Sequence, residues 1–168
     1  MKLSNTVVLA DTPDRIWSAL LDPEVLQQCL PGCTSLDQVE DQTYIANLKT
    51  QIGPLKTTFK GKVTLSDPTP PPNDPATITI AGEGKSPAGI VRGEAVVQLR
   101  TAEGKTELSY DANATIGGKI AQLGGRVVDA VAQKMAKEFF AKFAETTAPA
   151  APAGDNPPSE PPPAGDAD

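Results

Sequence analysis

Histidine is absent from this sequence of 168 residues, and there are only two cysteines, Cys29 and Cys33. Because these two residue types supply most zinc and transition-metal sites, the composition argues against a bound metal. The two cysteines also lack the C-x-x-C spacing of thiol oxidoreductases. We therefore expect two reduced thiols in a reducing compartment.

Long apolar runs are also missing. No run approaches the roughly 18 residues of a membrane-spanning helix, and Met1 to Ala10 lacks the layout of a signal peptide. We therefore expect a cytoplasmic protein. The 21 acidic residues outnumber the 15 basic ones. Nucleic acid is not an expected partner, because its binding needs a concentrated basic surface.

The last part of the chain has the composition of a disordered tail. Ala148 to Asp168 contains seven prolines and six alanines, with no aromatic or large aliphatic residue. Such a segment cannot bury enough apolar area to offset its ordering entropy. The sequence therefore predicts a folded domain over residues 1–147 and a Pro/Ala-rich acidic tail over residues 148–168.

The folded part begins with a β-prone run, Leu3 to Ala10, and continues with helix signals. Thr12 followed by Pro13 is typical of a helix start, with Thr12 as N-cap. Asp22-Pro23 breaks and restarts the helix, and Pro31-Gly32 ends it. This pattern predicts a strand followed by two short helices.

The middle of the chain alternates between apolar and polar residues. The alternation runs through residues 44–52, 55–65, 77–82, 92–100 and 106–116, with a proline-rich loop at Asp67 to Pro75. A period of two predicts antiparallel strands with one apolar and one polar face. Ile120, Leu123, Val127, Val131 and Met135 then recur at helical spacing, which predicts one helix from Lys119 to Ala144.

That helix is the one element available to cover the apolar face of the sheet. Many inward positions carry small residues, which predicts a cavity between helix and sheet, although small residues would also permit close packing. The predicted ligand-binding lining is Leu48, Thr50, Phe59, Val63, Ile80, Ala95, Val97, Leu108, Tyr110, Ala112, Leu123, Val127 and Val131.

Polar groups are rare in this lining. Thr50, Thr57 and Tyr110 are its few polar groups, and no acid, histidine or lysine points inward. Because acid–base or nucleophilic catalysis needs a poised titratable group, we predict no catalytic residue and a protein that binds an apolar molecule.

The C-terminal end of the predicted helix carries Phe139, Phe140 and Phe143. Residues 139 and 140 are about 100° apart on a helix, so we expect at least one ring to be partly exposed. The three rings either close the end of the core or contact a membrane or partner.

Several short segments resemble a known family when they are taken in order. They are Cys29-Leu30-Pro31-Gly32-Cys33, Ile52-Gly53-Pro54-Leu55-Lys56, Phe59-Lys60-Gly61-Lys62-Val63, the run from Gly117 to Gly124, and Phe139-Phe140. Residues 1–145 resemble the CoxG family of carbon monoxide dehydrogenase subunits, within the START/Bet v 1-like (SRPBCC) superfamily.

The resemblance implies an α+β helix-grip fold: a seven-stranded antiparallel sheet wrapped around a long C-terminal helix, with two short helices after the first strand. It also implies an accessory protein that holds no covalently bound cofactor. Such a protein carries a quinone (menaquinone or ubiquinone) or a lipid for a molybdenum-containing carbon monoxide dehydrogenase or related hydroxylase, or links that enzyme to the membrane.

Weak peripheral contact with the inner face of the cell membrane would suit this role. Many family members have a C-terminal membrane-anchoring segment, whereas the tail here is polar and acidic. The alternatives are a small cyclase- or hydratase-like enzyme of the same superfamily and a ligand-free assembly factor.

Overall fold

The computed structural model describes residues 1–147, so the predicted tail lies outside the described residues. The elements follow the order β1 (Lys2–Leu9), α1 (Pro13–Leu20), α2 (Pro23–Cys29), β2 (Cys33–Glu40), β3 (Thr43–Ile52), β4 (Leu55–Thr69), β5 (Ala76–Ser86), β6 (Gly89–Ala102), β7 (Lys105–Gly117), a short 3₁₀ helix η1 (Gly118–Leu123) and α3 (Gly125–Thr147).

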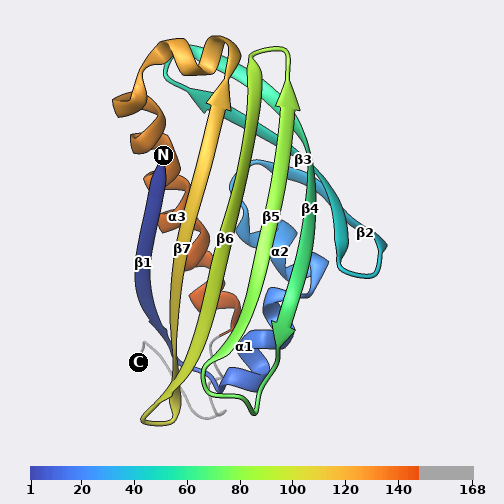
Figure 1. Cartoon of the computed structure of the whole chain (residues 1–168), viewed down its shortest axis with the longest axis vertical. Helices are drawn as coiled ribbons and strands as arrows, with labels where there is room; N and C mark the ends of the chain where they lie inside the picture. The colour runs from blue at the N-terminus through green and yellow to red at the C-terminus, as the bar shows by residue number, and fades with distance from the viewer. Residues whose placement is uncertain (148–168) are drawn as a thin grey trace, which may run out of the picture.

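The seven strands form one antiparallel sheet in the order β1-β7-β6-β5-β4-β3-β2. Figure 1 shows that the sheet curves and that all three α-helices lie on the same side of it, with α3 running along the direction of β7 and β1. This arrangement confirms the predicted helix-grip fold.

The turns of the sheet are divided between its two ends. Figure 1 shows the β5–β6 turn and η1 at the upper end, with the β3–β4 turn beside them. The β4–β5 and β6–β7 turns lie at the lower end, near α1. The division follows from antiparallel order, since consecutive strands reverse direction and alternate turns fall at opposite ends.

The prediction of one helix from Lys119 to Ala144 was wrong. Gly124 has φ +93°, a conformation that glycine adopts readily and other residues do not, and it separates η1 from α3. The side chain of Ile120 is fully buried, and its backbone N–H donates to the carbonyl of Ala88 at 3.0 Å. Ile120 and Leu123 therefore belong to a separate segment that closes the upper end of the sheet.

The structure differs from the expectations for the N-terminal half in three respects. β4 extends to Thr69, so the first three residues of the predicted loop Asp67 to Pro75 belong to a strand. Thr12 occupies the N-cap position of α1, but its side chain makes no capping hydrogen bond; at α2 the side chain of Asp22 accepts from the N–H of Glu24 at 3.0 Å. Strand β2 was not predicted from the sequence pattern. Leu36 is its one buried residue, so its sequence does not alternate clearly between apolar and polar residues.

The buried side chains form two clusters. The lower cluster joins α1, the lower halves of β6 and β7, and the end of α3, and includes Ile16, Leu99, Leu108 and Phe143. The smaller upper cluster contains Ile52, Phe59, Ala88 and Ile120. α3 therefore belongs to a packed core at its C-terminal end, while its first turns meet the upper cluster.

Gly32 provides a test of how tightly the α2–β2 connection is held. Gly32 and Gly104 have nearly equal φ angles, +79° and +80°, but a Cβ on Gly32 would overlap the carbonyl oxygen of Lys49, whereas a Cβ on Gly104 would meet nothing within 4 Å. We expect both Ala variants to lose about 1–2 kcal/mol of unfolding free energy from the left-handed backbone.

We expect Gly32→Ala to lose roughly 1–3 kcal/mol more, from the overlap. Urea unfolding of the two variants measures the difference. Equal losses would mean that the connection moves aside freely.

Candidate functional site

A cavity of about 470 Å³ lies between the sheet and α3. α3 comes closest to the sheet at β1 and β3, and the cavity remains beneath its N-terminal half. From α3 the cavity is lined by Val128, Val131, Ala132 and Met135, and from η1 by Ile120. The cavity therefore lies between the upper and lower clusters.

The register of the sheet explains why space remains here. One row of cross-strand neighbours is Ala46, Gly61 and Gly84, and the next is Val63, Gly82, Gly93 and Ala114. Ala95 and Ala112 face each other in the row below. Small residues that are scattered along the sequence thus become one continuous floor.

Close packing does not require glycine at positions 61 and 82 of this floor. A Cβ on Gly61 would meet nothing closer than 3.6 Å, and one on Gly82 nothing closer than 3.8 Å. Gly93 is tighter, with the carbonyl oxygen of Asn113 at 3.0 Å from the Cβ position. A Cβ at Gly61 or Gly82 would therefore make only ordinary van der Waals contacts, and both glycines line the cavity.

The structure places the predicted lining residues at several heights along the strands. Those that line the cavity are Leu48, Thr50, Phe59, Val63, Ile80, Ala95, Ala112 and Val131. Val97, Leu108 and Tyr110 share the inward face but are buried in the lower cluster. Leu123 packs against the upper cluster, and Val127 is 36% exposed beside Gly53 of the β3–β4 turn and does not line the cavity.

Some lining residues were absent from the predicted set. Ile116 belongs to the inward positions of the last alternating run, and Met135 belongs to the apolar stripe of the helix, so the sequence held a signal for both. Ile120 also belonged to the helical pattern but enters from η1, and Leu30 comes from the end of α2. Only the tertiary structure shows that Leu30 reaches the cavity.

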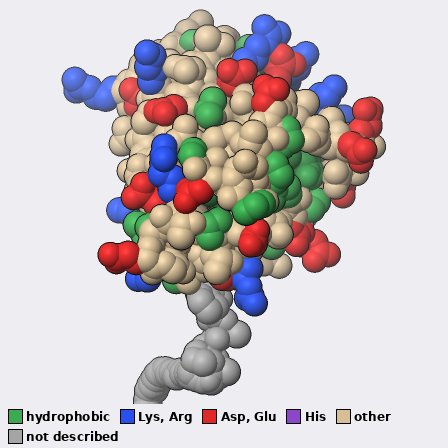
Figure 2. Space-filling view, turned by 60° about the horizontal axis from the view of Figure 1, so that its bottom comes forward, with side chains coloured by type: hydrophobic (Ala, Val, Ile, Leu, Met, Phe, Trp, Pro, Cys, Tyr) green, Lys and Arg blue, Asp and Glu red, His purple; other side chains and the backbone are tan. Residues whose placement is uncertain are grey.

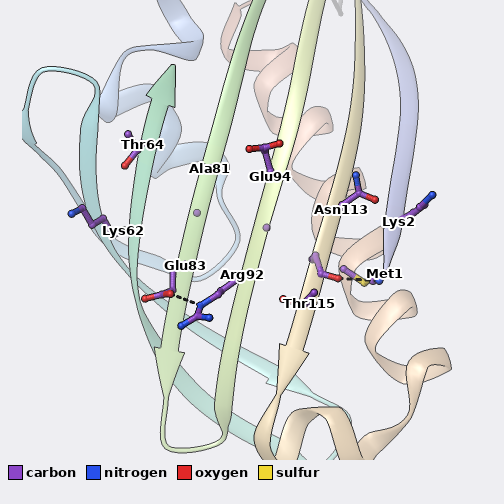
Figure 3. A pocket seen from close by; sticks show the side chains of 13 residues that line it. Met1, Lys2, Lys62, Thr64, Ala81, Glu83, Arg92, Glu94, Asn113 and Thr115 are labelled. Atoms are coloured by element: carbon purple, nitrogen blue, oxygen red, sulfur yellow. Dashed lines mark hydrogen bonds and ion pairs between the residues drawn. The ribbon is translucent and has the colours of Figure 1, made fainter. Parts of the chain in front are cut away.

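The charged side chains that border this cavity point away from it. Glu83 and Glu94 touch it only through the thin glycine floor, and Figure 3 shows their side chains in front of the sheet, in a shallow pocket on the face away from α3. There Glu83 accepts a hydrogen bond from Arg92, which lowers the pKa of Glu83. The lining residues named above direct no titratable side chain into the cavity.

Thr50 supplies the hydroxyl of the lining, and none of the hydrogen bonds within residues 1–147 involves its side chain. The other two predicted polar groups lie elsewhere. Thr57 pairs with Thr50 across β3 and β4 but does not line the cavity. Tyr110 is buried, which raises the pKa of its hydroxyl, and its ring stacks on Phe140 with centroids 5.3 Å apart.

The phenylalanines at the end of α3 form a packed aromatic group. Phe143 is fully buried, and its ring stacks on Phe139 with centroids 5.5 Å apart. Phe139 and Phe140 are half-buried, in agreement with the expected partial exposure, and both pack against the lower cluster. These rings therefore hold the C-terminal half of α3 in the core.

The two cysteines are free, with Cys29 buried and Cys33 half-buried. Burial raises the pKa of both thiols above the ordinary value, which reduces the thiolate fraction. Within residues 1–147, no group of three or more His, Cys, Asp or Glu side chains could hold a metal ion. None of the helices in this range is long and apolar enough to cross a membrane.

Comparison with protein families identifies the chain. The family model for CoxG, described as a carbon monoxide dehydrogenase subunit, matches residues 6–148. The chain belongs to the CoxG family. No curated protein matches it significantly. The CoxG match spans every element that builds the cavity, apart from the first residues of β1.

Solved structures share the CoxG-family fold. A conserved protein from Geobacillus kaustophilus is 28% identical with TM-score 0.80, covering 88% of this chain and 95% of that one. The Zhui aromatase/cyclase from Streptomyces sp. R1128 is 13% identical with TM-score 0.64, covering 88% and 93%.

A START superfamily protein from Mycobacterium smegmatis is 14% identical with TM-score 0.63, covering 87% of this chain and 96% of that one. The likeness to this protein and to the aromatase/cyclase shows the fold alone. CoxG family membership and the START-like fold together suggest a protein that binds a hydrophobic ligand.

Neighbouring positions on β6 test the cavity. Ala95 lines it, whereas Val96 is 40% exposed on the opposite face. We expect Ala95→Phe to fill the space and reduce binding of the apolar dye anilinonaphthalene sulfonate at least tenfold, with little change in melting temperature. Val96→Phe should bind the dye like the wild type. Unfolding of Ala95→Phe would show a core already full, since overpacking costs roughly 1–3 kcal/mol.

Proposed function

We propose that this CoxG-family protein binds a hydrophobic quinone, menaquinone or ubiquinone, in the cavity between α3 and the sheet. It carries the quinone as electron acceptor for a molybdenum-containing carbon monoxide dehydrogenase or a related hydroxylase. The observation that supports this most is a cavity of about 470 Å³ whose lining is apolar except for the Thr50 hydroxyl.

The size and chemistry of the cavity suit such a ligand. Small-molecule sites commonly span about 300–1,000 Å³ and combine apolar walls with a few placed polar groups. A quinone head is flat and carries carbonyl oxygens that accept hydrogen bonds. Thr50 can donate one of these bonds, while aliphatic side chains such as Leu48 and Val131 enclose the ring and the start of the isoprenoid chain.

The family supports the same assignment from a different direction. The description of the CoxG family ties it to carbon monoxide dehydrogenase. An enzyme that oxidises carbon monoxide must pass its electrons to an acceptor, and membrane quinones are nearly insoluble in water. A protein with a dry cavity shields the quinone from water between the bilayer and the enzyme.

An enzymatic role of the cyclase or hydratase type is less well supported. One structural neighbour is an aromatase/cyclase, but that likeness concerns the fold alone. Acid–base chemistry needs a titratable group within hydrogen-bond reach of the substrate. Glu83 and Glu94 lie on the outer face of the sheet (Figure 3). The open cavity also favours a binding protein over an assembly factor with a filled core.

Thr50 and Thr57 provide a matched pair for testing the hydrogen bond to the quinone. Thr50→Val removes the hydroxyl and keeps the shape of the side chain. We expect the Kd for a short-chain menaquinone, measured by isothermal titration, to rise about 5–10-fold, which corresponds to a hydrogen bond of roughly 1 kcal/mol. Thr57→Val, the control, should leave the Kd unchanged, and equal effects would remove Thr50 from the site.

The carrier role is tested with the protein from its own host. Organic extraction followed by mass spectrometry should recover a quinone. Adding the protein to the molybdenum hydroxylase should increase carbon monoxide-dependent reduction of menaquinone held in vesicles, and Ala95→Phe should abolish the increase. If no quinone is recovered and none binds on titration, the proposed function is wrong.

A further inference from the structure

The fold separates the charges of this protein along its long axis. The β3–β4 hairpin, the β5–β6 turn, η1 and the first turn of α3 meet at the upper end (Figure 1). Residues 43–65, 84–93 and 117–128 form these elements and contain eight Lys or Arg but no Asp or Glu. This concentration stands out in a chain whose net charge is −6.

The basic end is defined here by six exposed side chains: Lys49, Lys56, Lys60, Lys85, Lys119 and Arg126. Within residues 1–147, the ion pairs are Arg15–Asp11, Lys85–Glu83 and Arg92–Glu83. Five of the six therefore have no acidic partner in the described part of the chain. Lys60 and Lys85 even face each other across β4 and β5, a like-charge pair that costs stability.

The opposite end is acidic. Glu40, Asp41, Asp67, Asp74 and Glu103 lie in or beside the β2–β3, β4–β5 and β6–β7 turns, and Asp11 and Asp14 lie at the start of α1. Figure 2 brings the lower end forward and shows acidic side chains around this face, interspersed with basic ones. An anionic surface would therefore attract the upper end and repel the lower one.

Apolar groups are exposed among the charges of the basic end. Pro54 is exposed at the tip of the β3–β4 hairpin, and Val127 is 36% exposed beside it, with its Cγ1 3.4 Å from the Cβ position of Gly53. Apolar side chains flanked by cations are typical of surfaces that enter the interfacial region of a bilayer.

The cavity reaches the same end of the molecule. Ile52, Ile120 and Val128 line it, and all three lie in or against the upper cluster directly beneath the β3–β4 tip. Ile52 and Ile120 are buried there, so a ligand that leaves a bilayer at this end has to pass the upper cluster to reach the cavity.

We propose that the basic end docks on an anionic lipid bilayer and places the cavity of the protein against the membrane surface. The choice of a bilayer over an acidic protein rests on the apolar tip and on the proposed function, because a hydrophobic quinone is loaded from lipid. Each lysine near an anionic surface strengthens binding about fivefold, so the attachment is reversible and sensitive to salt.

Charge reversal at the two ends provides a matched test. Vesicles of phosphatidylcholine, with or without about one third phosphatidylglycerol, are sedimented with the protein at low and high salt. The wild type should bind only the anionic vesicles and be released by salt. The partition coefficient of the triple variant Lys49→Glu, Lys56→Glu, Lys60→Glu on anionic vesicles should be more than tenfold lower than that of the wild type.

The control triple variant Lys105→Glu, Lys137→Glu, Lys142→Glu changes the net charge equally, using exposed lysines away from the basic end. It should keep most of the binding. Equal losses in the two variants, equal binding to neutral vesicles, or binding to an acidic protein without any to vesicles would overturn the proposal.

Titration with short-chain menaquinone separates this inference from the proposed function. The basic-end variant should bind the quinone in solution like the wild type, because its lysines lie outside the cavity. If the wild type binds anionic vesicles but no quinone, docking stands and the quinone assignment fails. If it binds quinone but no vesicles, the quinone assignment stands and the docking proposal fails.

Discussion

The register of β4, β5 and β6 sets Gly61 in one row and Gly82 and Gly93 in the next, and at these positions the sheet offers α3 no side chain to pack on. α3 is held instead at its two ends. Phe143 fixes its C-terminal half in the lower cluster, and η1 ties its start to the β5–β6 turn. The cavity exists because these two anchors keep the helix above the sheet.

A hollow core is stable only if its two ends are well packed. The atoms that line an empty cavity lose dispersion contacts, and a protein offsets this loss with close packing elsewhere. Ile16, Leu108 and Phe143 below, with Ile120 above, are fully buried. An apolar ligand would restore the missing contacts, so the unliganded architecture is complementary to an apolar molecule rather than to a charged substrate.

The same antiparallel order that builds the cavity also separates the charges. Alternate turns fall at opposite ends of the sheet, so lysines of the β3–β4 hairpin gather at one end and acids such as Asp41, Asp74 and Glu103 at the other. Since the cavity itself directs no titratable group inward, electrostatics acts on the outside of this protein and apolar contact on the inside. Binding and orientation are thereby carried by different residues.

The sequence by itself determined the elements and their faces, because both depend on neighbouring residues. Period two placed Ala95 inside and Val96 outside, and Asp22-Pro23 marked the break between α1 and α2. The family resemblance supplied the remaining strand and the helix-grip fold. Only the tertiary structure decided where along the strands the cavity lies. Val97 and Leu108 are buried in the lower cluster below it, and Leu30 is part of its lining. It also decided the break at Gly124. Both depend on which strands are neighbours and in what register, and no local pattern records contacts between residues far apart in the chain.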